Sequence, residues 1–116
     1  MNIIVLKIKI KNCMFGIFKS LFGGGDITNK LREGAFLVDV RTPVEFDGGH
    51  VKGSVNIPLD RVAISLEKFK NKKNIIVFCR SGNRSSQAKS ILEKNGFTNV
   101  TNGGTWQSVN QQLKNP

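Results

Sequence analysis

A cysteine at the end of an apolar run is the residue of this chain best suited to do chemistry. Cys79 follows the apolar residues 75–78 and opens the polar segment 79–85, beyond which a helical pattern begins. Backbone N–H groups at a helix N-terminus, with arginines nearby, stabilise a thiolate and can lower a thiol pKa from about 8.5 to roughly 3.5–7.5. Such a pKa makes the reactive thiolate a large fraction of the protein at neutral pH. The segment therefore predicts an activated sulfur nucleophile in an anion-binding loop.

The residues that follow the cysteine are expected to surround its sulfur. Gly82 suits a bend that needs a positive φ or a close backbone approach. Arg80 and Arg84 would add positive charge for an anionic substrate, and the alternative is that they are exposed charges at a helix start. The candidate substrate-binding loop comprises Arg80, Ser81, Gly82, Asn83, Arg84 and Ser85.

Strand and helix patterns alternate along the chain around this loop. Residues 36–40, 54–57, 74–78 and 97–101 are typical of strands, and 74–78 is continuously apolar, as in a central strand covered on both faces. Helices are predicted over residues 27–33, 60–69, after the Cys79 loop up to Asn95-Gly96, and from Trp106 to Leu113. The segment 41–53, with Pro43 and several glycines, reads as a polar loop.

This alternation favours an α/β fold, with an open, mostly parallel sheet and helices on both faces. In such sheets ligands bind at the carboxyl ends of the strands, and Cys79 lies at one of these ends. The predicted fold and the predicted chemistry therefore point to the same place.

Composition narrows the classes of protein. A chain of 116 residues fits one domain. The only cysteines, Cys13 and Cys79, lack C-x-x-C spacing, and there is one histidine, so we expect no disulfide scaffold, metal site or cofactor. The net charge of +10 favours anionic small molecules or acidic proteins as partners. Nucleic acid is not expected, because no stacking aromatics are interleaved with the basic residues.

Residues 1–25 are expected to form a leader separate from the domain at 26–116. The leader holds four lysines, no acidic residue, several phenylalanines and a Gly23-Gly24-Gly25 end. Its apolar run at 3–6 is too short for a membrane span or an export signal, so we expect a cytoplasmic protein. A disordered leader, weak contact with a membrane surface, and a true start at Met14 all stay open. Cys13 is expected to be a bystander rather than a partner of Cys79.

Four segments in order resemble the single-domain rhodanese-like family of thiosulfate sulfurtransferases. They are residues 37–46 (LVDVRTPVEF), 49–58 (GHVKGSVNIP), 79–85 (CRSGNRS) and 102–106 (NGGTW). The resemblance implies a sheet of about five strands and transfer of sulfane sulfur through a persulfide on Cys79. It leaves little room between residues 26 and 36 for the strand and helix that the family places first.

The resemblance also suggests roles for residues outside the loop. Asp39 near its strand end, and Arg41 with Glu45, are expected to form hydrogen bonds and ion pairs that fix the loop after that strand as structural support. His50 is expected to be a structural hydrogen-bonding residue, Phe46 either walls the pocket or packs in the core, and Trp106 is expected in the core. The expected partners are a small anionic sulfur donor such as thiosulfate, and a thiol, a protein or cyanide as acceptor.

Two other functions stay open. A cysteine-dependent phosphatase or arsenate reductase also places a thiolate and an arginine in a loop before a helix. Such enzymes use one more residue than the four between Cys79 and Arg84, because they enclose a tetrahedral oxyanion. The other alternative is a non-catalytic sulfur carrier or protein-binding module.

Overall fold

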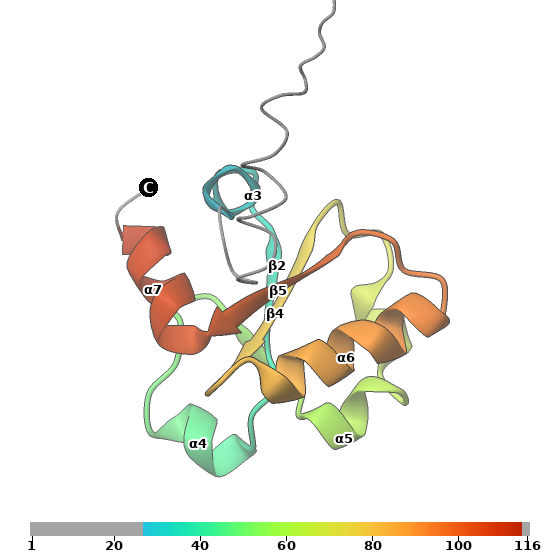
Figure 1. Cartoon of the computed structure of the whole chain (residues 1–116), viewed down its shortest axis with the longest axis horizontal. Coiled ribbons are helices and arrows are strands. Elements are labelled where there is room, and N and C mark those ends of the chain that lie inside the picture. The colour runs from blue at the N-terminus through green and yellow to red at the C-terminus, as the bar shows by residue number, and fades with distance from the viewer. Residues whose placement is uncertain (1–26, 115–116) are drawn as a thin grey trace, which may run out of the picture.

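The computed structural model describes residues 27–114, which form one open sheet with helices packed against it (Figure 1). Its elements, labelled as in Figure 1, are α3 (Thr28–Arg32), β2 (Phe36–Asp39), α4 (Pro43–Asp47), β3 (Val55–Asn56), α5 (Leu59–Val62), the 3₁₀ helix η1 (Leu66–Phe69), β4 (Ile75–Cys79), α6 (Asn83–Lys94), β5 (Val100–Thr105) and α7 (Trp106–Lys114).

The four strands of the sheet run parallel in the order β3-β2-β4-β5. β4 is central, since Phe36 to Asp39 of β2 pair with Ile75 to Phe78 on one side, and β5 pairs on the other. Every residue of β4 is buried. The predicted open parallel sheet is confirmed, with four strands in the described part of the chain where about five were expected.

Helices cover both faces of the sheet, as predicted, because alternate strand residues point to opposite sides. Val77 and Cys79 pack with Val62, Ala88 and Leu92 in the core beneath α5 and α6. Ile76 and Phe78 face the other way and pack with Ile27 and Val109 beneath α3 and α7. Cys79 therefore ends a buried strand on the α6 face.

Two of the predicted elements differ from the structure. The helix expected over residues 60–69 is instead α5 followed by η1, joined by a turn in which Ser65 N–H donates to the Val62 carbonyl. Apolar residues at steps of three suit a 3₁₀ turn as well as an α-helix. The last strand begins at Val100 instead of Phe97, and the Asn99 carbonyl just before it accepts from Ile75 N–H.

The segment predicted as a polar loop after β2 contains α4. Thr42 caps this helix: its hydroxyl accepts from Glu45 N–H, and the Glu45 carboxylate accepts from Thr42 N–H. This reciprocal capping box, with Pro43 in the first turn, stabilises even a five-residue helix. The helix matters for the site because it fixes the position of Glu45.

A bulge interrupts the pairing of β4 and β5 next to the cysteine. Val77 pairs with Asn102 and Phe78 with Gly104, so Gly103 is the extra residue. A Cβ atom on Gly103 would lie 2.8 Å from the Val109 side chain and 2.9 Å from that of Ile76. Only glycine lets α7 pack this closely on the sheet, and the bulge reorients β5 beside the site.

The leader at residues 1–25 and Cys13 lie outside the described residues. Within 27–114, none of the helices has the length and apolar character needed to cross a membrane. The cytoplasmic location stays a prediction.

Candidate active site

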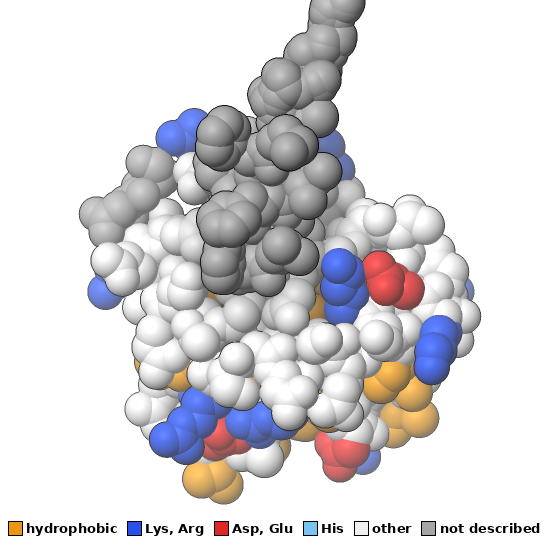
Figure 2. Space-filling model, viewed as in Figure 1, with side chains coloured by type: hydrophobic (Ala, Val, Ile, Leu, Met, Phe, Trp, Pro, Cys, Tyr) orange, Lys and Arg blue, Asp and Glu red, His pale blue; other side chains and the backbone are white. Residues whose placement is uncertain are grey.

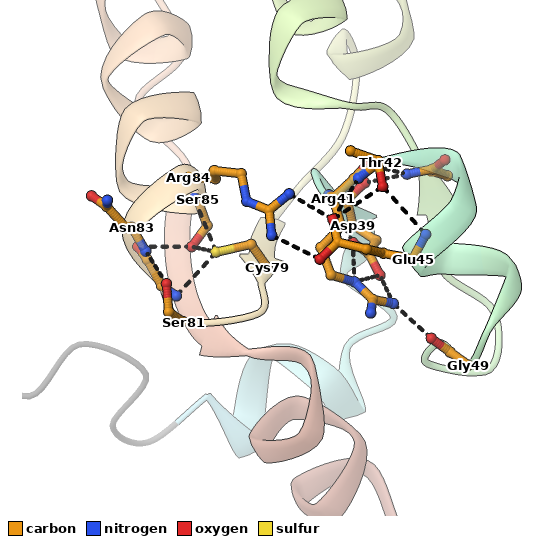
Figure 3. A network of polar contacts seen from close by, with 12 residues as sticks. Asp39, Arg41, Thr42, Glu45, Gly49, Cys79, Ser81, Asn83, Arg84 and Ser85 are labelled. Carbon is orange, nitrogen blue, oxygen red and sulfur yellow. Dashed lines mark hydrogen bonds and ion pairs between the residues drawn. The ribbon is translucent and has the colours of Figure 1, made fainter.

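Cys79 lies at the carboxyl end of β4, where the chain turns into α6, and its side chain is fully buried. Gly82 N–H donates to Sγ at an N···S distance of 3.0 Å, and Ser85 N–H donates at 3.4 Å. The Ser85 hydroxyl lies 3.5 Å from Sγ (Figure 3). The predicted ring of backbone donors around the sulfur is therefore present.

Gly82 makes this ring possible. It precedes α6 with a φ of 95°, in the left-handed region that side chains disfavour. This conformation lets its N–H point back at Sγ while its carbonyl accepts from Ser86 N–H in the first turn of the helix. The glycine predicted from the sequence is thus required by the backbone itself.

The surroundings of Cys79 favour the thiolate. Burial of the sulfur is the largest influence and raises the thiol pKa, because it disfavours charge. Hydrogen bonds from the Ser85 hydroxyl and from the N–H groups of Ser85, Ser81 and Gly82 outweigh burial, and the net pKa is lowered. The activation comes from neutral dipoles in contact with the sulfur.

Asn102 holds this arrangement from the neighbouring strand, and its role was not predicted. Its Oδ1 accepts from the Ser85 hydroxyl at 2.7 Å and from Gly104 N–H at 2.9 Å. Its Nδ2 donates to the Gly82 carbonyl at 3.2 Å. The only signal in the sequence was the polar residue before Gly103-Gly104, and its direction depends on the bulge.

Arg84 pairs with Glu45 of α4. Its Nη1 and Nη2 donate to Oε1 and Oε2 of Glu45 at 2.7 and 3.0 Å (Figure 3). The Arg84 hydrogen bond is the main reason that the pKa of Glu45 falls to about 2, and Glu45 in turn raises the pKa of Arg84. This bidentate pair ties the first turn of α6 to α4, so the partner of Glu45 is Arg84 and not Arg41 as expected.

Asp39 and Arg41 form a second, buried pair. Arg41 Nε lies 2.9 and 3.0 Å from the two Asp39 oxygens, and Nη2 lies 2.7 Å from Oδ2. Nη2 also donates to the Gly49 carbonyl at 2.7 Å, and the guanidinium lies 4.8 Å from the centre of the Trp106 ring. The pair links the end of β2 to the segment after α4 and to α7.

The remaining predicted residues have separate places. Arg80, Ser81 and Asn83 are exposed on the outside of the loop. His50 is exposed, its ring stacks on Phe46 at 3.7 Å, and its Nδ1 contacts the Phe46 carbonyl at 2.8 Å. These contacts give Phe46 and His50 structural roles. None of them joins His50 to Cys79.

A metal site needs several side chains that can bind one ion together. Within residues 27–114, no group of three or more His, Cys, Asp or Glu side chains lies close enough together to hold a metal ion. The chemistry that the arrangement supports is nucleophilic attack by sulfur, followed by transient storage of the product as an anion in the donor ring.

Comparisons with known proteins agree with this architecture. Thiosulfate sulfurtransferase PspE of Escherichia coli (strain K12) is 41% identical over 69 residues, 58% of this chain and 66% of that protein. Uncharacterized protein YqhL of Bacillus subtilis (strain 168) is 40% identical over 68 residues, 59% of this chain and 54% of that protein. The chain thus spans between about half and two thirds of the length of these two relatives.

Solved structures show the same fold. A rhodanese with anions from E. coli superposes with a TM-score of 0.59 at 36% identity, over 65% of this chain and 91% of that one. The human single-domain sulfurtransferase TSTD1 gives a TM-score of 0.61 at 25% identity, over 73% and 89%. The model of the rhodanese-like domain matches residues 23–105. The resemblance inferred from the four motifs is confirmed, and the chain belongs to the rhodanese-like domain family.

Proposed function

We propose that this protein is a sulfurtransferase that carries sulfane sulfur as a persulfide on Cys79. Thiosulfate or another sulfane-sulfur compound is the donor, and a thiol or cyanide is the acceptor. The single observation that carries the proposal is the ring of N–H donors directed at Sγ, with Gly82 N only 3.0 Å away. Relatives named as thiosulfate sulfurtransferases, PspE of E. coli among them, support the same reaction class.

The ring suits both anions of the reaction. The Cys79 thiolate attacks the outer sulfur of thiosulfate, an S–S bond forms, and the bond to the inner sulfur breaks with its electron pair leaving on sulfite. The product is a persulfide anion of unchanged charge. An acceptor thiolate then attacks the terminal sulfur, which restores the Cys79 thiolate and yields the acceptor persulfide. The lowered pKa of the Cys79 thiol favours attack without a general base.

The placement of Arg84 favours sulfur transfer over phosphoryl transfer. A phosphatase arginine must present its guanidinium to the oxygens of the substrate. Here Nη1 and Nη2 of Arg84 are both bound to Glu45. The ring left around Sγ is composed of backbone amides and one hydroxyl, which matches a single sulfur atom better than a tetrahedral oxyanion.

Mass spectrometry of the reduced protein after brief exposure to thiosulfate tests the proposal. We expect one added sulfur on the peptide that contains Cys79, released by cyanide or a thiol, and none in a Cys79→Ser variant. A Cys13→Ser variant is the matched control and keeps the adduct. A folded protein with an ionised Cys79 that takes up no sulfur would refute thiosulfate as the donor, and failure with organic persulfides as well would refute sulfur transfer.

A further inference from the structure

A hollow of about 300 Å³ lies beside the thiol loop and has no role in the chemistry described so far. Its walls are the side chains and backbone of Arg41, Val44, Glu45, Gly48, Gly49, Arg80, Trp106 and Gln107. Figure 2 shows that basic side chains, with an acidic one between them, gather at the α4 end of the molecule. The volume is at the lower end of the range of small-molecule sites, roughly 300–1,000 Å³.

The charges around this hollow leave one cation without a partner. The Glu45 carboxylate is bound by Arg84 and Thr42, and Arg41 is bound by Asp39. Arg80 is exposed and makes no ion pair with any residue in 27–114. The five charged groups therefore sum to one positive charge, and Arg80, which lines the hollow, carries it.

Arg41 supplies a second donor that the protein leaves unused. Its side chain is only 5% exposed, and its Nε and Nη2 are occupied by Asp39 and Gly49. Its Nη1 donates to no acceptor within the described residues. Within these residues, every side-chain nitrogen or oxygen atom that is buried from solvent has a hydrogen-bond partner. Nη1 has no such partner, so it must be in contact with solvent. Arg41 lines the hollow, which provides that contact.

The position of the hollow fits an acceptor better than the donor. Cys79 is not among the lining residues, whereas Arg80 follows it directly in the chain. Thiosulfate carries its charge one bond from the sulfur that reacts, so its charged group stays beside Sγ. A longer molecule can place an anionic group several bonds from its sulfur, beside Arg41 and Arg80 in the hollow.

We infer that the hollow is the acceptor subsite and that it binds the carboxylate of a small acidic thiol. The inference rests on the proposed sulfur transfer and adds its acceptor class. The carboxylate accepts from Nη1 of Arg41 and pairs with Arg80, while the carbon skeleton lies against Trp106. The thiol end then reaches the Cys79 persulfide, so an acidic thiol discharges it faster than a neutral thiol of equal thiol pKa does.

Direct binding tests the subsite apart from catalysis. Trp106 is the only tryptophan of the chain, so its fluorescence reports on the hollow. In the Cys79→Ser variant, we expect mercaptosuccinate to change this fluorescence saturably and 2-mercaptoethanol to cause no saturable change. Gln107→Glu adds a negative charge to the rim and should weaken binding about threefold to fivefold, and Gln107→Lys should strengthen it by a similar factor. Thr98→Glu, at the other end of the sheet, is the control for net charge.

Discharge of preloaded persulfide tests the link to transfer. We expect the ratio of the rates with mercaptosuccinate and 2-mercaptoethanol, each corrected for its thiol pKa, to fall in Gln107→Glu and rise in Gln107→Lys. No saturable fluorescence change, or a change caused equally by thiosulfate and competitive with it, would overturn the acceptor assignment. A protein that binds mercaptosuccinate but cannot be loaded with sulfur refutes the proposed function, and the acceptor role with it, while leaving the site as a carboxylate site.

Discussion

The sulfur and the two ion pairs beside it are stabilised in different ways. Around Cys79 the contacts made by residues 27–114 are N–H groups and one hydroxyl, with no charged side chain among them. In the neighbouring scaffold, Asp39 with Arg41 and Glu45 with Arg84 pair full charges at 2.7 Å. The thiolate is thus held by neutral dipoles, while the charges fix the elements that aim those dipoles.

This division has a chemical consequence. A cation in contact with Sγ would stabilise the thiolate but would also hold back an anionic leaving group or persulfide. Backbone dipoles stabilise both anions without such a partner, and their positions are set by the fold. Substitutions in the scaffold should therefore act on stability, whereas substitutions in the ring should act on the acidity of the thiol.

Removing the Asp39 carboxylate should have the largest effect on stability. Asp39→Asn leaves the Arg41 charge buried without compensation, which costs about 3–5 kcal/mol in comparable buried pairs. Asp47→Asn, at an exposed position on α4, should change the free energy of unfolding by no more than about 0.5 kcal/mol. Denaturant unfolding measures both, and an equal effect of the two would contradict the scaffold role of the buried pair.

Alanine substitutions at two glycines separate the effect of backbone strain on stability from the effect on the pKa of the Cys79 thiol. Gly82 and Gly53 have φ of 95° and 84°, so alanine at either should cost about 1–2 kcal/mol. Neither added Cβ meets an atom closer than 3.5 Å. Only Gly82→Ala should raise the thiol pKa, because relief of the positive φ by a backbone shift moves the N–H of residue 82 away from Sγ. The pH dependence of Cys79 alkylation measures the thiol pKa in both variants. An unchanged thiol pKa in Gly82→Ala would contradict activation by the ring of backbone donors.

Removing the Ser85 hydroxyl should change both the stability of the protein and the pKa of the Cys79 thiol by moderate amounts. Ser85→Ala removes the hydroxyl that lies 3.5 Å from Sγ and leaves the Asn102 carbonyl with one fewer hydrogen bond, at a cost of about 1 kcal/mol. The thiol pKa should rise as well. Ser86→Ala, at the exposed neighbouring position, should change neither quantity. Should Ser85→Ala lower the thiol pKa instead, the hydroxyl would have to act as an acceptor from the thiol.

Glu45→Gln should have the smallest effect on stability and a distinctive pH dependence. The Glu45 pKa falls from 4.5 to about 2 on folding, so its contribution is complete above pH 4.5 and disappears as the pH falls through 2. The stability difference from the unmodified protein, at most about 1 kcal/mol, should shrink over that window. Urea unfolding across the acid range measures it, and a difference that grows toward low pH would have the wrong sign.

The sequence predicted the sheet, the thiol loop and the family, because each depends on local patterns. A continuously apolar run identified β4, and residue order identified the loop and Gly82. The role of Asn102 was missed, because it depends on a bulge at Gly103 that packing against Val109 creates. The pairing of Glu45 with Arg84 joins residues 39 positions apart, which no spacing rule reveals.

The most direct test of dipole activation is the pKa of Cys79, measured by ultraviolet thiolate absorbance in a Cys13→Ser background at low and high salt. The account predicts a pKa below that of a free cysteine, nearly independent of salt, since donors in contact with a buried sulfur are not screened. A pKa at or above the free value would show that burial outweighs the hydrogen bonds to the sulfur. A pKa that rises to the free value in high salt would show that distant charges activate the thiol.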